Sequence, residues 1–331
     1  MHIPENYLSP STCAVMTVAM VPVWIHAVRK VKEEIPKEKM PALGIGAAFS
    51  FLGMMFNIPM PGGTTGHAVG GTLIACMLGP NAACLSVSVA LILQALLFGD
   101  GGILAIGANC FNMAFVLPYL GYAIYSAIAK RVPDTKGKLI GAAVGSYVGI
   151  NAAALCAAIE FGIQPYLFTN AAGEALYCPY PLSVSIPAMM LGHITIFGLA
   201  EMIFTTAILA FVLKTSPGMV REETNTSRKP VIVLMLALIA AVPLGLLAEG
   251  TAWGEWATEE IAEVVSRGQA LGYTPAGMAN GWSLESMMPD YTMAGLPDVA
   301  AYILSAIIGV AIVVILFRIV TAAMKSKVSF D

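Results

Sequence analysis

Long apolar runs separated by short polar loops constrain this chain more than any other feature of its sequence. Only 11% of the residues are charged, against about 25% in soluble domains, and several runs approach the roughly 20 residues with which a helix crosses a bilayer. Within lipid, a helix satisfies its backbone hydrogen bonds internally. We therefore predict an all-α integral membrane protein, a polytopic helical bundle with about nine spans at residues 11–28, 40–58, 65–79, 82–98, 103–129, 139–161, 186–213, 231–249 and 299–320.

The third run, 65–79, differs from the others because it is short and rich in glycine. Pro59 and Pro61 precede it, and Pro80 follows it. Non-helical backbone at membrane depth is tolerated where protein surrounds it. We therefore expect a partial helix or a re-entrant segment here.

The distribution of Lys and Arg predicts the orientation of the bundle, because cationic loops stay on the cytoplasmic side. These residues cluster between spans one and two, between five and six, between seven and eight, and after the last span. Loop 162–185 has no Lys or Arg, and loop 250–298 carries many acids with Arg267 as its one cation. An external N-terminus and a cytoplasmic C-terminus satisfy all four clusters. This topology places residues 1–2 and the turn 59–67 at the outer face.

A polar stretch divides the chain into two units. Residues 214–229 are mostly polar and include a Ser-Pro-Gly turn and the run Thr-Asn-Thr-Ser, which is typical of a linker. We expect a first unit at 1–229, which includes this linker. The second unit, 230–331, is a hairpin of two spans around the acidic external loop 250–298.

The N-terminal dipeptide Met1-His2 offers three nitrogens to a metal ion: the Met1 amine, the His2 amide and the His2 imidazole. A bulky second residue should protect Met1 from methionine aminopeptidase, and binding of all three nitrogens closes a five-membered and a six-membered ring. A fourth nitrogen would complete a planar set, which suits Ni(II) or Cu(II), and Co(II) less strictly. The alternative is an ordinary initiator methionine followed by a histidine without function.

A second candidate ligand, His67, lies at the centre of segment 61–72, whose five glycines allow close backbone approach. An ionisable residue inside a membrane segment is a functional candidate, with a hydrogen-bonded histidine in a packing helix as the alternative. No carboxylate or thiolate belongs to this nitrogen set, which argues against Ca2+, Mg2+ and structural Zn2+. Because the amide must lose its proton, affinity should fall in acid.

Four sequence segments occur together here: Met1-His2-Ile3-Pro4, residues 61–72, residues 94–102 (Gln-Ala-Leu-Leu-Phe-Gly-Asp-Gly-Gly) and Gly107-Ala108-Asn109. In these segments the chain resembles the CbiM/NikM family, the cobalt and nickel substrate-binding components of energy-coupling-factor (ECF) transporters, which are ABC transporters. The resemblance covers about 1–213. The segment 230–331 resembles the small accessory subunit, CbiN or NikN, in its architecture.

The resemblance implies a multi-pass protein of the prokaryotic cell membrane that transports Ni2+ or Co2+, with no other cofactor; cobalt uptake of this kind serves cobalamin biosynthesis. Met1, His2 and His67 match the ion ligands of the family residue by residue. The implied partners are a transmembrane coupling subunit (CbiQ/NikQ-like) and a cytoplasmic ATPase (CbiO/NikO-like), because this chain has no G-x-x-x-x-G-K-[ST] loop. We expect a transport subunit, with neither enzymatic activity nor a nucleic-acid partner.

Polar residues near the two histidines are candidates to orient them, as outer-shell groups do at metal sites. These candidates are Thr64, Thr65, Gln94, Asn109 and Asn112. Hydrogen bonding between helices is the alternative for each of them. We expect Asp100 to be a solvated turn residue, with attraction of cations as its alternative.

Small residues recur at every fourth position in two of the spans. Ala42, Gly46 and Ser50 form one ladder, and Gly141, Gly145 and Gly149 form the other. Such ladders allow close helix contact. We predict that the ladder from Ala42 to Ser50 faces the coupling subunit, with contact inside the chain as the alternative.

His193 and Glu201 lie on the seventh span, about two helical turns apart. Burying an acid in a membrane is costly, so we expect a role in coupling or in bonding between helices. A proton relay would instead suit a stand-alone secondary transition-metal transporter, the second candidate function. Such a transporter should show inverted repeats and acidic residues at the middle of the membrane, but no convincing repeat is found and Glu201 is the only clear acid in the middle of a span. The nitrogen set itself does not discriminate nickel from cobalt.

Overall fold

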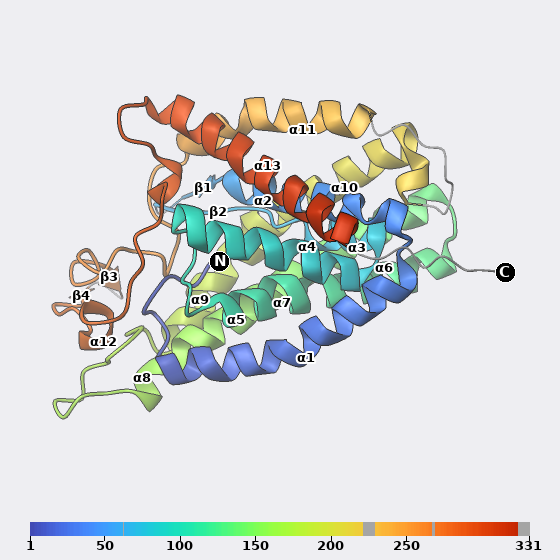
Figure 1. The fold of residues 1–331 in the computed structure, drawn as a ribbon. Helices are drawn as coiled ribbons and strands as arrows, with labels where there is room; N and C mark the ends of the chain where they lie inside the picture. The colour runs from blue at the N-terminus through green and yellow to red at the C-terminus, as the bar shows by residue number, and fades with distance from the viewer. Residues whose placement is uncertain (62, 221–228, 267–268, 324–331) are drawn as a thin grey trace.

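The computed structural model describes residues 1–61, 63–220, 229–266 and 269–323 as a bundle of helices with two short hairpins (Figure 1). The helices are α1 (Pro10–Glu34), α2 (Pro41–Met55), α3 (Gly71–Leu78), α4 (Pro80–Leu93), α5 (Ile106–Asn109), α6 (Leu117–Arg131), α7 (Thr135–Gly162), α8 (Gln164–Leu167), α9 (Leu182–Gly192), α10 (Gly198–Thr215), α11 (Lys229–Ala241), α12 (Ala276–Ala279) and α13 (Asp298–Ala323). The strands β1 (Ile58–Met60) and β2 (Thr64–Gly66) pair antiparallel, as do β3 (Val265–Ser266) and β4 (Gln269–Ala270).

Helical turns of other geometry extend several of these helices. π-helical turns at Gln94–Phe98, Cys110–Val116 and His193–Phe197 continue α4, join α5 to α6 and join α9 to α10, and a 3-10 turn at Val242–Leu247 extends α11. With these extensions, seven helices among the described residues are long and apolar enough to cross a membrane: α1, α4, α5–α6, α7–α8, α9–α10, α11 and α13. The prediction of an all-α, polytopic membrane protein is confirmed.

The two remaining predicted spans are shorter. α2 has 15 residues and α3 has 8, whereas a spanning helix needs about 20. The hairpin β1–β2 and a loop lead into α3, and α3 ends at Gly79, where φ is +88°. Residues 71–77 are all buried, so protein rather than lipid surrounds this helix. The expected partial helix within 65–79 is therefore present.

The loops gather at two ends of the bundle (Figure 1). The N-terminus, the hairpin β1–β2, α8 and the segment with β3, β4 and α12 lie at one end. The connection from α6 to α7 lies at the opposite end. The external position of the N-terminus stays a prediction. Five of the Lys and Arg residues used to predict the orientation lie outside the described residues: Arg221, Arg228, Arg267, Lys325 and Lys327.

The ladder of Ala42, Gly46 and Ser50 is buried inside the chain, which corrects the prediction that it faces a coupling subunit. All three residues of the ladder are buried. A Cβ at Gly46 would lie 3.0 Å from the Ile74 side chain of α3, and the Ser86 hydroxyl of α4 donates to a backbone carbonyl of α2 at 3.0 Å. The small residues bring α2 close to α3 and α4, so this ladder serves packing within the chain.

The second ladder also serves contact within the chain. Gly141, Gly145 and Gly149 of α7 face α6, and an added Cβ at Gly149 would approach the Leu117 carbonyl to 2.6 Å. At Gly145 the added atom would lie against the backbone of Gly121. Close backbone approach at three successive turns therefore fixes α6 against α7.

We predict that Gly145→Leu destabilises the bundle, because the side chain has no space between α7 and α6. Overpacking of this kind costs about 1–3 kcal/mol. The midpoint of thermal unfolding, measured by intrinsic fluorescence in detergent, should fall by several degrees. Val144→Leu is the matched control, since Val144 is the residue before Gly145 and its side chain is 43% exposed. Equal midpoints for the two variants would show that the contact is not close.

Candidate metal centre

The N-terminal segment folds back into the bundle instead of extending from it. Met1, His2 and Ile3 are 5%, 2% and 0% exposed. The side-chain amide of Asn109 in α5 accepts a hydrogen bond from the Ile3 N–H at 2.7 Å and donates one to the Ile3 carbonyl at 3.1 Å. The Gly102 N–H donates to the same carbonyl at 2.8 Å. Asn109 and Gly102 thus fix the backbone immediately after His2.

Gly101 and Gly102 allow the N-terminal segment to lie directly against the loop that follows α4. A Cβ at Gly102 would meet the Glu5 nitrogen at 2.7 Å and the Pro4 carbonyl carbon at 2.9 Å, and Gly101 has a φ of +90°. The Glu5 carboxylate accepts a hydrogen bond from the Ile103 N–H at 2.6 Å. Burial raises the pKa of Glu5 above its ordinary value, and the backbone N–H groups oppose this shift.

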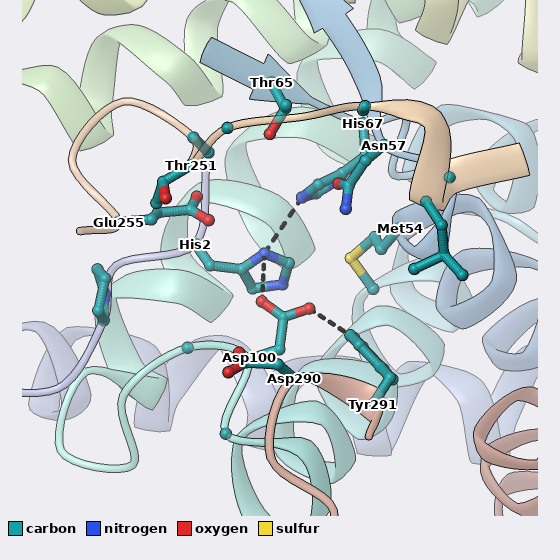
Figure 2. A pocket seen from close by; sticks show the side chains of 18 of the residues that line it. His2, Met54, Asn57, Thr65, His67, Asp100, Thr251, Glu255, Asp290 and Tyr291 are labelled. Atoms are coloured by element: carbon teal, nitrogen blue, oxygen red, sulfur yellow. Dashed lines mark hydrogen bonds and ion pairs between the residues drawn. The ribbon is translucent and has the colours of Figure 1, made fainter. Parts of the chain in front are cut away.

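His67 meets His2 at the centre of the site (Figure 2). The hairpin β1–β2 delivers His67, which is 7% exposed. Its Nδ1 lies 3.2 Å from the Ala68 carbonyl, and its Nε2 lies 3.2 Å from Nδ1 of His2. Because a carbonyl only accepts, Nδ1 of His67 is the donor, and its Nε2 directs a lone pair at His2. Two imidazoles 65 positions apart in the chain thus face one another.

Two carboxylates contact the Met1 amine and the His2 imidazole. The Met1 amine lies 2.7 Å from Glu255 Oε1, and His2 Nδ1 lies 3.1 Å from Asp100 Oδ1. The Tyr291 hydroxyl donates to Asp100 Oδ2 at 2.5 Å (Figure 2). The expectation that Asp100 is a solvated turn residue is therefore wrong, because this carboxylate turns inward to His2.

A cavity of about 320 Å³ adjoins these groups. The first unit contributes His2, His67 and Asp100 to its lining, and the second unit contributes Glu255, Asp290 and Tyr291. Burial, and to a smaller extent the charge of Asp100, raises the pKa of Asp290. Among the described residues, no group of at least three His, Cys, Asp or Glu side chains is arranged to hold a metal ion.

Four of the five residues predicted to orient the histidines line one of the two cavities or hydrogen-bond to residues around His2. Thr65 lines the cavity, and Thr64 lines a second cavity of about 20 Å³ together with Met1. Gln94 donates to Asp100 at 3.1 Å and to the Tyr291 hydroxyl at 2.8 Å, and Asn109 binds Ile3 as described above. The fifth, Asn112, instead donates to Glu160 of α7 at 2.8 Å.

His193 and Glu201 approach the site from the helix α9–α10. His193 lines the smaller cavity with Met1, and its Nδ1 lies 2.8 Å from the Met189 carbonyl. Glu201 accepts hydrogen bonds from the backbone of Val69 and Gly70. Both residues are buried, at 5% and 0% exposure.

Glu255 and Tyr291 were not predicted as site residues. Both belong to loop 250–298, whose acidic character is visible in the sequence, but nothing in that loop marks one carboxylate above the others. Tyr291 has a φ of +59° and Asp290 a φ of +51°, which is uncommon for residues other than glycine. This local conformation, which aims Tyr291 at Asp100, has no sequence signal.

Comparison with known families identifies both parts of the chain. The family described as cobalt uptake substrate-specific transmembrane region, CbiM, matches residues 2–219. The PDGLE domain matches residues 227–326.

Proteins similar over almost the whole length are transport proteins. A probable fused nickel transport protein, LarMN, of Lactiplantibacillus plantarum is 49% identical over 321 residues, which cover 96% of this chain and 97% of that protein. The fused nickel transport protein NikMN of Rhodobacter capsulatus is 44% identical over 333 residues, 95% of each chain. A solved structure of a truncated transition metal transporter is 55% identical, with a TM-score of 0.61, and covers 65% of this chain and 99% of its own.

These matches, with the seven apolar helices, identify a multi-pass protein of the prokaryotic cell membrane. The chain belongs to the CbiM family of cobalt and nickel transport proteins, as a CbiM region fused to a CbiN-like PDGLE domain.

Proposed function

We propose that this protein is the substrate-capture subunit of an ECF transporter that imports Ni2+ or Co2+. Four nitrogens hold the ion: the Met1 amine, the His2 amide, His2 Nδ1 and His67 Nε2. The observation that carries the proposal is the separation of 3.2 Å between His67 Nε2 and His2 Nδ1 in a buried site. Two donors at right angles, each about 2.0 Å from a metal, are about 2.8 Å apart. The observed separation is therefore within a few tenths of an ångström of the one that a shared ion requires.

The identity of the His2 nitrogen supports this geometry. Chelation by a residue's own amide and imidazole closes a six-membered ring only through Nδ1, because Nε2 lies on the far side of the imidazole. Nδ1 is the His2 nitrogen that faces His67. The Met1 amine closes the five-membered ring on the other side of the amide, so His67 supplies the fourth corner of a plane.

Nickel is the cargo to test first. Strong nitrogen donors in a plane suit Ni(II), and two relatives similar over almost their whole length are named nickel transport proteins. Cobalt remains the second cargo, since the family itself is described by cobalt uptake.

The carboxylates around the site suggest how the ion is loaded. Asp100, Glu255 and Asp290 line the cavity beside the histidines, and a cavity lined by one sign of charge concentrates ions of the opposite sign. Glu255 and Asp100 contact the Met1 amine and His2 Nδ1, which are both proposed ligands. Loading therefore exchanges these two carboxylate contacts for the metal ion, and the protons of the Met1 ammonium group and the His2 amide are released to solvent.

Partner subunits supply the energy in this proposal. The chain has no phosphate-binding G-x-x-x-x-G-K-[ST] loop, so a cytoplasmic ATPase and a membrane coupling protein complete the transporter. We place the capture site at the outer face and the domain boundary at 229/230. A stand-alone secondary transporter is less well supported, because the carboxylate of Glu201 is engaged by backbone N–H groups rather than by a titratable partner.

We predict that His67→Ala weakens Ni2+ binding by more than about 100-fold, because even outer-shell partners of a metal site typically contribute about 10- to 100-fold. Isothermal titration of the purified full chain measures the affinity, and monodisperse elution shows that the variant is folded. His26→Ala is the matched control, since His26 lies exposed on α1. Unchanged affinity of the folded His67 variant would refute the site.

We also predict that residues added before Met1 abolish high-affinity Ni2+ binding, because they convert the terminal amine into an amide. The same residues added after Asp331 should leave binding unchanged. Intact mass of the purified protein establishes whether the chain begins at Met1 with a free amine, as the proposal requires. Equal binding by the two extended proteins would exclude the amine as a ligand.

A further inference from the structure

The carboxylate of Glu201 holds the loop that carries His67. Glu201 lies in the first turn of α10 and is 0% exposed. Its Oε2 accepts hydrogen bonds from the Val69 N–H at 2.7 Å and the Gly70 N–H at 3.0 Å, and its Oε1 is 3.1 Å from the same Gly70 nitrogen. The Thr205 hydroxyl, one turn further along α10, is 3.4 Å from Oε1. These contacts connect α10 to the residues directly before α3.

The position of the carboxylate explains why an acid is tolerated there. Burying a carboxyl group without hydrogen bonds costs several kcal/mol, and here two successive backbone N–H groups converge on it, as in anion-binding backbone nests. Gly70, with a φ of +73°, is the N-cap of the eight-residue α3. Glu201 therefore holds the two N–H groups that immediately precede α3, and not those of its first turn.

A short path connects this contact to the proposed ligand. Val69 and Gly70 follow His67 by two and three residues, with Ala68 between. The Ala68 carbonyl accepts from His67 Nδ1 at 3.2 Å, and this contact leaves Nε2 directed at His2. A loop held at Val69 and Gly70 keeps the Ala68 carbonyl in place, and the carbonyl keeps the ring and its tautomer in place. Carbonyl or carboxylate partners of metal-binding histidines orient them in this way.

We propose that Glu201 is a positioning residue for the metal centre, which sets the orientation of His67 through the backbone of residues 68–70. The inference rests on the proposed nitrogen site and goes beyond it by assigning a role to the buried acid of α10. The carboxylate acts through its shape and its acceptor oxygens. It does not act as a relay for protons or as a charge that attracts the ion.

Two substitutions separate shape from charge. Glu201→Gln keeps the length of the side chain and one carbonyl oxygen, which can accept from both Val69 and Gly70. Glu201→Asp keeps the charge but shortens the side chain by one carbon–carbon bond, so that it no longer reaches the loop. Glu160→Asp is the matched control, because Glu160 is the other buried acid of the spanning helices among the described residues, at 6% exposure, and it binds Asn112 instead of the His67 loop.

The experiment uses the full chain, with Ni2+ as the probe. Isothermal titration gives the affinity, and visible absorption reports the ligand field of bound Ni2+, which changes when His67 leaves the metal. We expect Glu201→Gln and Glu160→Asp to bind within about threefold of the unmodified protein. Glu201→Asp should bind about 10- to 100-fold more weakly, the loss typical of outer-shell partners. Its Ni2+ spectrum should shift toward that of His67→Ala.

The affinities of the Glu201 and His67 variants distinguish a failure of this inference from a failure of the proposed nitrogen site. A tenfold loss in Glu201→Gln would show that charge matters, and would overturn the inference whether or not Glu201→Asp folds. Unchanged affinity and spectrum in a folded Glu201→Asp would overturn the inference as well, provided that His67→Ala binds Ni2+ much more weakly than the unmodified protein. If His67→Ala itself binds Ni2+ normally, the proposed nitrogen site fails first, and this result is distinct from a failure of Glu201 alone.

Discussion

Burial of the first three residues inside the bundle is the constraint on which the whole site depends. Met1, His2 and Ile3 belong to no helix or strand, so their position comes from contacts with other parts of the chain. The paired hydrogen bonds between Ile3 and Asn109 supply that position, and the glycine at 102 allows the close approach. Chain ends are usually mobile unless they are tied down. Here they are tied down at the proposed metal site.

The second unit is part of the same cavity and not only an appended hairpin. Glu255 contacts the Met1 amine, and Tyr291 contacts Asp100, which in turn contacts His2. The Tyr302 hydroxyl of α13 donates to the Met55 carbonyl at the end of α2, at 2.7 Å, and so fixes this unit against the first. The site thus combines nitrogen donors from the first unit with carboxylate and hydroxyl groups supplied in part by the second.

Much of the fold could be predicted from the sequence, because apolar runs bounded by charged loops leave few alternatives in a bilayer. The partial helix before Pro80 was predicted from the glycines and prolines around it. The ladder of Ala42, Gly46 and Ser50 was predicted to face a coupling subunit, but it packs inside the chain. Small residues indicate that a helix approaches closely, but they do not indicate which helix. Asp100 was misjudged for a related reason: its contact with His2 spans 98 positions in the chain, and no local pattern records such a contact.

X-ray absorption at the nickel edge of the Ni2+-loaded full chain tests the central claim most directly, because it counts the donor atoms and measures their distances from the ion. The account predicts about four nitrogen donors at about 2.0 Å, with the edge feature of a planar geometry and no sulfur. A six-coordinate shell without the planar edge feature, or a sulfur donor in the shell, would contradict it.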